Sequence, residues 1–229
     1  MVKDATREKL LELRETYGTA TAIEVAKKSL KINSSDVSFK QQFNGEVCET
    51  VLEMILQKII KEEHPDWFYS KSMILPNPDS NNEFLTELDF VLFTPNCVYC
   101  IECKSYAGKK IITDKGTVEL NKYSRDVYKQ NIMHLEMLSK LIGNFSESPV
   151  YRMVLFNFSR GDIVDKRDEK WKGIFPVVDE NTFPFVFKQE GKAVWDMQGL
   201  RAARVKLERF SEQNRERHLA YVQSLHGKK

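Results

Sequence analysis

EFLTELDFVLFTPNCVYCIECKSY, residues 83–106, is the stretch that decides the fold. Two apolar runs, residues 85–93 and 97–101, flank Thr94-Pro95-Asn96, and a Pro-Asn pair suits a tight turn. Aromatic and aliphatic side chains dominate both runs, as is typical of strands in a packed sheet. The stretch therefore predicts a β-hairpin.

Charged residues break the apolar character of this stretch, among them Asp89, Glu102 and Lys104. Residues two apart in a strand share a face, so Glu102 and Lys104 point the same way. If Asp89 shares that face, two carboxylates and one ammonium converge in an otherwise apolar sheet. Burying them costs free energy unless they are paired or bind a metal, which indicates a site. The alternative is a partly exposed strand with ordinary salt bridges.

A paired Asp and Glu beside a Lys suits one particular chemistry. Carboxylate oxygens are hard ligands that hold Mg²⁺ or Mn²⁺ and leave coordination positions open for water and phosphate. A neighbouring Lys can orient or deprotonate the attacking water and offset charge that develops on the phosphate. We therefore expect Asp89 and Glu102 to be metal ligands and catalytic residues, with Lys104 as the catalytic cation.

Twelve residues separate Asp89 from the Glu102-Cys103-Lys104 triplet, and this pattern resembles the PD-(D/E)xK nucleases. Gly45-Glu46, the string TELD ending at Asp89 and the string IECK ending at Lys104 are similar, more specifically, to the nuclease-related domain, NERD. The resemblance covers roughly residues 44–145. Leu88 stands where the family usually has Pro, and Cys103 where Val is more common, but neither change removes a functional side chain.

The resemblance implies an α/β fold with a restriction-endonuclease-like αβββαβ core, its mixed central sheet flanked by helices. It implies metal-dependent hydrolysis of phosphodiester bonds in nucleic acid, with DNA the expected polymer. Glu46 would complete the metal shell, with Glu49 as the alternative, and the Cys103 carbonyl would be a further ligand. Gln130 would act in catalysis by contacting metal-bound water or a phosphate oxygen. The simpler alternatives are a solvated glutamate face and a plain surface glutamine.

The triplet Asp/Glu-x-Lys is not specific, because it occurs three times in this chain. Asp168-Glu169-Lys170 lies in a charge-dense segment, and Glu190-Gly191-Lys192 surrounds a glycine. We expect both to be solvated surface. Only Glu102-Cys103-Lys104 follows a strand that carries a lone Asp.

The composition restricts the class of protein and its partners. The chain has 229 residues, of which 41% are hydrophobic and 30% charged, as in globular proteins. The net charge of +2 does not indicate a nucleic-acid partner, but Lys and Arg outnumber Asp and Glu in residues 101–130 and 201–229. These segments suit a polyanion or are ordinary solvated faces. No signal peptide or membrane-spanning run is evident, so we expect a cytoplasmic protein with no membrane partner.

Regularly spaced cysteines can form a metal site. Cys97, Cys100 and Cys103 are evenly spaced, but strand alternation places Cys100 on the face opposite the other two. Three thiolates on opposite faces cannot close one tetrahedral zinc site. We therefore expect buried, inert thiols, Cys48 included.

The chain is predicted to form three parts: a helical arm at residues 1–40, a NERD-like nuclease core at 41–190 and a C-terminal helix at 191–229. Within the core, residues 44–60 and 124–142 have helical periodicity. The inward residues of the second helix are expected to be Tyr128, Leu135, Leu138 and Ile142, with His134 a packed or solvated histidine. Short strands are expected at 67–75, 109–113, 117–120 and 150–158, and a loop at 162–172.

Two rival functions stay open on the sequence. The chain could be a non-catalytic nucleic-acid-binding module that keeps the fold without turnover. It could also be a scaffold subunit of a defence or repair assembly, with its end helices as docking surfaces. A homo-oligomer and a partner subunit are both compatible with the sequence.

Overall fold

The computed structural model describes residues 2–31, 35–76, 85–121, 123–142, 151–159, 161–189 and 196–226. The chain divides into two compact units. The first consists of Met1–Asp66, Cys103–Tyr128 and Val154–Gln189, and the second of Trp67–Glu102, Lys129–Met153 and Glu190–Lys229. Within the described ranges, no helix has the length and apolar character needed to cross a membrane.

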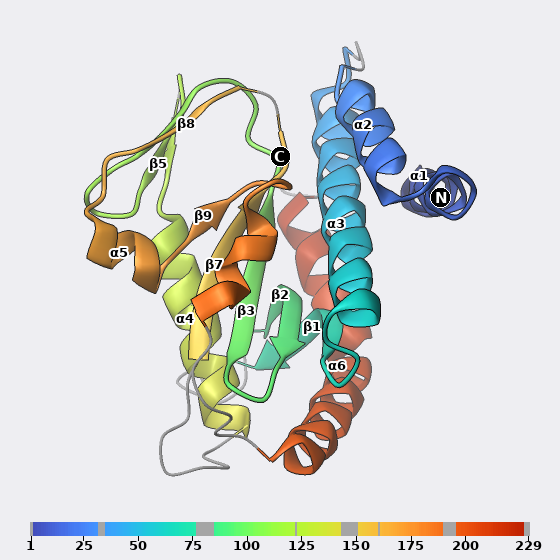
Figure 1. The fold of residues 1–229 in the computed structure, drawn as a ribbon, viewed down its shortest axis with the longest axis vertical. Helices are drawn as coiled ribbons and strands as arrows, with labels where there is room; N and C mark the ends of the chain where they lie inside the picture. The colour runs from blue at the N-terminus through green and yellow to red at the C-terminus, as the bar shows by residue number, and fades with distance from the viewer. Residues whose placement is uncertain are drawn as a thin grey trace. The chain divides into compact units, whose positions relative to one another are not determined.

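Three helices open the first unit and pack on one another: α1 (Val2–Tyr17), α2 (Thr19–Ser29) and α3 (Val37–Glu62) (Figure 1). Gly18 separates α1 from α2, because its φ of 85° lies in the left-handed region that favours glycine. Arg7 of α1 donates two hydrogen bonds of 3.1 Å to the carboxylate of Glu53 on α3. This bidentate pair fastens the first helix to the third.

Helix α3 begins at Val37, earlier than the predicted start at Asn44. The Asp36 carboxylate accepts a 3.0 Å hydrogen bond from the Phe39 amide, so Asp36 is the N-cap. Asn44 and Gly45 are weak helix formers, but buried Phe43 and Val47 flank them. Burial of this face outweighs the local propensity and carries the helix through both residues.

The larger sheet is mixed and has the strand order β1-β2-β3-β7-β9. Strand β2 (Leu85–Phe93) pairs antiparallel with β1 (Phe68–Pro76) and with β3 (Val98–Lys104). Strand β7 (Tyr151–Asn157) pairs parallel with β9 (Val177–Val178). The boundary between the units runs through β3, after Glu102, and through β7, after Met153.

The predicted β2–β3 hairpin is confirmed, and Thr94 closes its turn. The Thr94 hydroxyl donates to the Cys97 carbonyl at 2.9 Å and accepts from the Cys97 amide at 3.0 Å. The Thr94 amide also donates to the Cys97 carbonyl. Thr94 is fully buried, so its side chain satisfies backbone groups that water does not reach.

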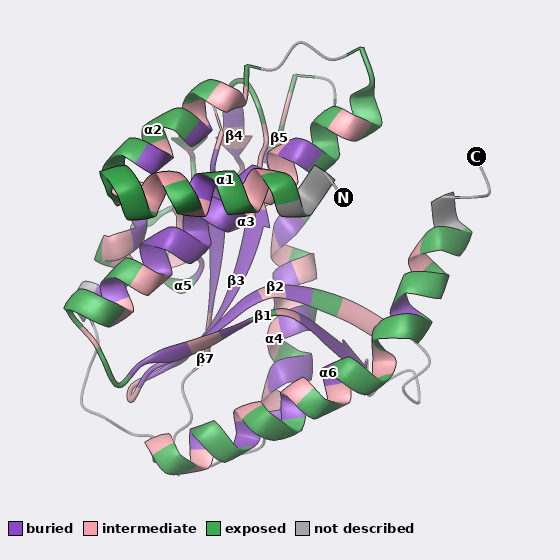
Figure 2. Cartoon of the chain, turned by 90° about the vertical axis from the view of Figure 1, so that its right-hand side faces the viewer, coloured by how far each residue is buried: buried purple, intermediate pink, exposed green. Residues whose placement is uncertain are grey.

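Two helices cover the hydrophobic core of the second unit: α4 (Val127–Ile142), which enters that unit at Lys129, and α6 (Met197–His226). Figure 2 shows α6 alongside β1 and β2, with its exposed residues turned away from the strands. One apolar cluster joins β2 and β3 to both helices, and includes Val91, Cys100, Leu138 and Leu207.

The inward face of α4 is partly as predicted. Leu138 and Ile142 are buried, whereas Tyr128 and Leu135 are half-buried. Val127, Asn131, His134 and Met137 are buried as well. Asn131 and His134 are polar, so apolar periodicity does not mark them as interior residues.

A smaller sheet in the first unit has the order β6-β5-β4-β8, formed by Ser124–Arg125, Val118–Glu119, Lys110–Ile112 and Ile163–Asp165. Strand β6 occupies the predicted first turn of the 124–142 helix, which starts at Val127. The predicted loop at 162–172 instead contains β8 and the start of α5 (Glu169–Ile174). A 3-10 helix, η2 (Phe183–Gln189), follows β9.

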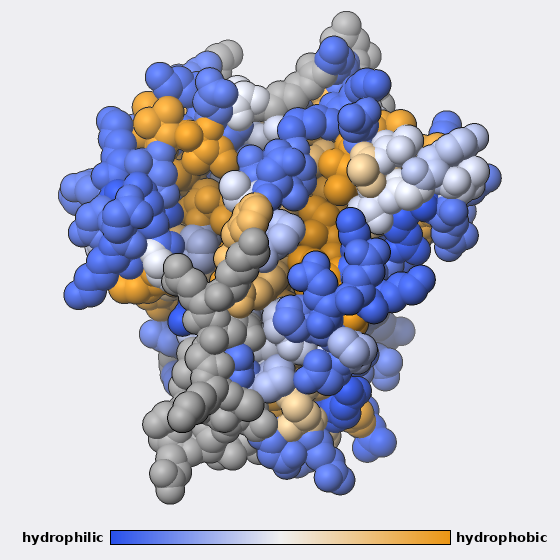
Figure 3. Space-filling view, in the orientation of Figure 1, coloured by the Kyte–Doolittle hydropathy of each residue, from blue (hydrophilic) through white to orange (hydrophobic). Residues whose placement is uncertain are grey.

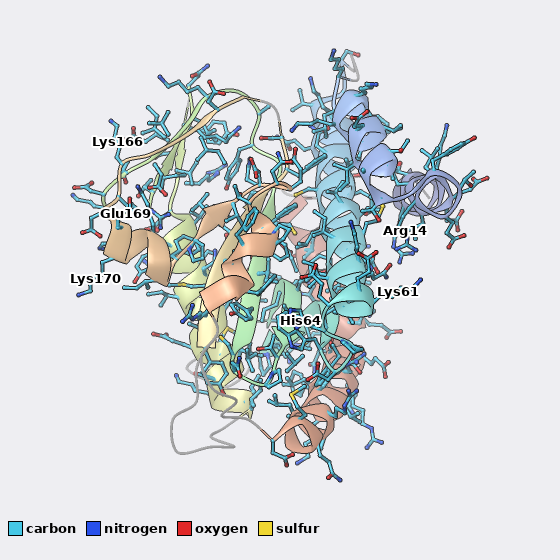
Figure 4. The ribbon with its side chains drawn as sticks, viewed as in Figure 1. Arg14, Lys61, His64, Lys166, Glu169 and Lys170 are labelled. Atoms are coloured by element: carbon cyan, nitrogen blue, oxygen red, sulfur yellow. The ribbon has the colours of Figure 1, made fainter. Side chains whose placement is uncertain are left out.

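Asp168-Glu169-Lys170, the second copy of the Asp/Glu-x-Lys triplet, is surface, as expected. Asp168 is the N-cap of α5 and accepts a 2.8 Å hydrogen bond from the Trp171 amide. Figure 4 shows Glu169 and Lys170 pointing away from the ribbon, and the side chains around α5 in Figure 3 are mostly hydrophilic. The third triplet, Glu190-Gly191-Lys192, lies outside the described residues.

Asp165→Asn should lower the free energy of unfolding by about 3 kcal/mol, because it leaves the buried Arg167 guanidinium without its charge partner. Burial alone would raise the pKa of Asp165, but hydrogen bonds from Arg167 hold this pKa below its ordinary value of 3.8. The carboxylate therefore stabilises the fold above that ordinary value, and its contribution is lost as the pH falls through the lower folded pKa.

Urea unfolding at neutral pH, repeated from about pH 5 down to about pH 2, measures both effects. The variant should lose less stability than the wild type over the acid range. Glu119→Gln, which changes an exposed carboxylate of the same small sheet, is the control and should stay within about 0.5 kcal/mol of the wild type. Equal losses in the two variants would show that the Asp165–Arg167 pair contributes nothing specific.

Candidate functional site

The β2–β3 register brings two carboxylates opposite one another. The paired residues end at Phe90–Ile101, next to Val91–Cys100, and extending this register by one residue sets Asp89 opposite Glu102. Directly opposed residues of antiparallel strands share a face, with Cβ atoms about 5 Å apart. The expectation that Asp89 lies on the Glu102 face therefore agrees with the register.

Both carboxylates affect the pKa of a neighbouring thiol, Cys100. Burial raises the pKa of Cys100 well above its ordinary value, and the charges of Glu102 and Asp89 raise it further. Cys100 precedes Glu102 by two residues on β3 and points to the same face. The thiol is held in its protonated form.

Glu102 is 2% exposed, and side chains of α4 surround its carboxylate. Gln130 Nε2 donates a 2.9 Å hydrogen bond to Glu102 Oε1. His134 Nδ1 lies 3.4 Å from Glu102 Oε2, close enough for an electrostatic contact but without hydrogen-bond geometry. Nε2 of His134 is 2.9 Å from Thr86 Oγ1 on β2.

His134 is a site residue that the sequence analysis missed. The histidine is 1% exposed and stands four residues after Gln130, one turn along the same face of α4. That i, i+4 spacing was the available signal, because a residue one turn from Gln130 reaches the same carboxylate. Its contact with Glu102 could not be inferred without the packing of α4 on the sheet.

Strand β1 is strained where it passes Asp89. The ladder pairs Lys71 with Phe90 and Met73 with Leu88, so Ser72 stands opposite Asp89 and outside the pairing. Ser72 has a φ of 50°, a conformation that costs about 1–3 kcal/mol for a residue with a Cβ. Strain of this kind persists where surrounding packing fixes the backbone, and here it falls beside a carboxylate.

The remaining predicted site residues belong to the first unit. The Lys104 carbonyl accepts a 3.1 Å hydrogen bond from the Phe158 amide and a 3.4 Å contact from Cys48 Sγ. Alternation along β3 puts Lys104 on the Glu102 face and Cys103 on the other. Glu46 is half-buried on α3. The metal shell that the resemblance implies is thus divided between the units.

Asp89 and Glu102 suit a hard divalent cation by their chemistry, because both offer carboxylate oxygens and a carboxylate has about four acceptor positions. Gln130 occupies one of these positions on Glu102 and leaves others. Within the described part of the chain, no group of three or more His, Cys, Asp or Glu side chains is arranged to hold a metal.

The four cysteines are buried free thiols. Cys97 Sγ contacts the Val98 carbonyl at 3.6 Å, and Cys100 packs in the apolar core of the second unit. In these surroundings the thiols behave as small hydrophobic side chains.

Comparisons with known proteins were made on the whole chain. Residues 44–157 match the family model of the nuclease-related domain, NERD. No curated protein is significantly similar in sequence. Protein VC1899 from Vibrio cholerae is similar in structure, with a TM-score of 0.41 and 13% identity over 82% of this chain. The match spans 49% of that protein's chain.

Gln130→Ala should lower the free energy of unfolding by about 1.5–3 kcal/mol, because it removes a hydrogen bond to a buried carboxylate. Thermal and urea unfolding measure the change. Glu136→Gln, at an exposed position on the same helix, should stay within about 0.5 kcal/mol of the wild type. If Gln130→Ala is as stable as this control, Gln130 does not stabilise the buried carboxylate.

Proposed function

Because residues 44–157 place this chain in the nuclease-related domain family, we propose that it is a metal-dependent nuclease that hydrolyses phosphodiester bonds, with DNA as the substrate. The observation that supports this most is the register that sets Asp89 opposite Glu102. Two carboxylates on one sheet face, with a lysine two residues beyond the second, form the set that this chemistry needs.

Mg²⁺ or Mn²⁺, when bound, would supply a Lewis acid that polarises the phosphate and lowers the pKa of bound water. Asp89 and Glu102 would hold it through carboxylate oxygens, with the Cys103 carbonyl and Glu46 as further ligands. Lys104 would orient the attacking water and offset negative charge on the phosphate. Gln130 keeps Glu102 oriented through its 2.9 Å hydrogen bond.

We also propose that the chain has the restriction-endonuclease-like core. Its support is the order α3, β1, β2, β3, α4 and β7, which is the αβββαβ order, with the β4–β6 segment inserted before α4. The mixed sheet of β1, β2, β3, β7 and β9 agrees with that arrangement.

One observation favours a second candidate, a nucleic-acid-binding module without turnover. Gln130 donates to Glu102 Oε1 and His134 Nδ1 lies 3.4 Å from Glu102 Oε2, so side chains of α4 already stand beside both oxygens. In that case Glu102 stabilises the packing of α4 on the sheet. Stability with and without metal separates the two functions.

Lys104→Ala should reduce cleavage at least 100-fold while metal affinity stays equal or increases slightly, because removing a positive charge relieves repulsion of the cation. Asp89→Asn should lose both cleavage and metal affinity, because it replaces a charged carboxylate with a neutral amide, whose oxygen binds a divalent cation more weakly. Plasmid, linear duplex and single-stranded substrates, each incubated with Mg²⁺ or Mn²⁺, measure cleavage. Melting with and without the cation measures binding.

Lys170→Ala is the matched control, because Lys170 ends the exposed Asp168-Glu169-Lys170 triplet. It should cleave and bind metal as the wild type does. Two results together would contradict the nuclease and support the non-catalytic module. The wild-type melting temperature would be the same with and without Mg²⁺ or Mn²⁺, and Asp89→Asn would be strongly destabilised in the absence of metal.

A further inference from the structure

A basic pocket lies in the first unit, where the chain leaves β3. Its volume is about 500 Å³, and its polar lining consists of Lys31, Lys40, Asn44, Ser105 and Ser159. Ser105 follows Lys104 directly in the sequence. None of the residues that line the pocket is acidic.

A buried ammonium stands behind one wall of this pocket. Lys110 is 1% exposed, and its Nζ lies within 3.1 Å of the carbonyls of Tyr106, Gly108 and Gly161 and of Ser159 Oγ. Burial lowers the pKa of Lys110, an effect that the charge of Asp162 opposes. The carbonyl oxygens carry only partial charges, so the cation keeps a positive potential at its outer edge.

Ser159 lines the pocket, and the Lys110 ammonium polarises its hydroxyl. Ser159 Oγ accepts from Lys110 Nζ at 2.9 Å and from Asn157 Nδ2 at 2.9 Å, so two donors occupy its lone pairs. The Asn157 orientation is fixed, because its Oδ1 accepts from the Tyr106 amide. The Ser159 O–H therefore has its donor still available for a ligand, and no acceptor for it is found among the described residues.

The pocket floor is rigid. Gly108 lines it, and Gly161 packs against Gly108 so closely that a Cβ on Gly161 would lie 2.6 Å from the Gly108 carbonyl oxygen. Gly161 also has a φ of 90°, which favours glycine. Lys110 bonds to both glycine carbonyls. A site held in this way loses little conformational entropy when a ligand binds.

Ser159 also lines a second pocket, of about 490 Å³. Comparing the charges that line the two pockets indicates which of them suits an anion. That pocket contains Asp162, Asp179 and Glu180, with Lys27 as its basic residue. An anion is repelled there and attracted to the side of Lys31 and Lys40.

We infer that the basic pocket is a phosphate subsite, which binds a phosphate group of a nucleic-acid strand through the Ser159 hydroxyl, Lys40 and Lys31. The inference rests on the proposed function for its choice of polymer. The binding chemistry is independent of cleavage, because an anion only has to accept from a polarised hydroxyl in a pocket lined by two lysines.

Binding of labelled single-stranded and duplex oligonucleotides, measured in EDTA at several salt concentrations, tests the subsite. Lys40→Ala should reduce the slope of log affinity against log salt by about 0.7–0.9, since one phosphate contact is lost. Ser159→Ala removes a neutral donor and should weaken binding about fivefold with the slope unchanged. Lys61→Ala, an exposed lysine on α3 at a different pocket, should change neither (Figure 4).

Equal effects of Lys40→Ala and Lys61→Ala would overturn the subsite, as would wild-type protein that binds no oligonucleotide. Inorganic phosphate and pyrophosphate are tested separately, and tight binding of either without oligonucleotide binding would overturn the nucleic-acid assignment. Pocket-dependent binding without cleavage under Mg²⁺ or Mn²⁺ would support the subsite and contradict only the nuclease. Melting confirms that each variant is folded, and Lys40→Ala keeps the test decisive if Ser159→Ala is unstable.

Discussion

The burial of Glu102 is the constraint on which the second unit depends. A carboxylate that is 2% exposed needs polar partners, and α4 supplies Gln130 and His134. Helix α4 can do so only with a polar residue at each of these positions, one turn apart. The same helix packs Leu138 into the apolar core, so one face of α4 serves both the core and the carboxylate.

A second constraint is the strain beside Asp89. Ser72 holds a φ of 50° opposite this residue, in a strand whose flanking pairs remain regular. Backbone strain and a buried charge in the same part of a sheet both lower stability. Their coincidence is typical of positions retained for chemistry rather than for packing, and it agrees with the nuclease proposal.

In the first unit, polar groups organise segments that have little apolar surface. Arg7 and Glu53 join α1 to α3, and Arg167 joins β8 to the end of α5 through Asp165 and the Phe175 carbonyl. Lys110 gathers the turn at Gly108 and the turn at Gly161 around one ammonium. Arg167 and Lys110 are buried, and their bonds to carbonyls and carboxylates hold short strands and turns in a defined form.

The sequence by itself determined the hairpin and the helical segments, because apolar alternation, turn residues and caps act over a few residues. It did not reveal β8, α5 or the early start of α3, where pairing and burial override local preference. Only the tertiary structure decided that His134 contacts Glu102 and that Lys110 supports Ser159. Such contacts join residues far apart in the chain, and no local pattern encodes which buried polar groups meet.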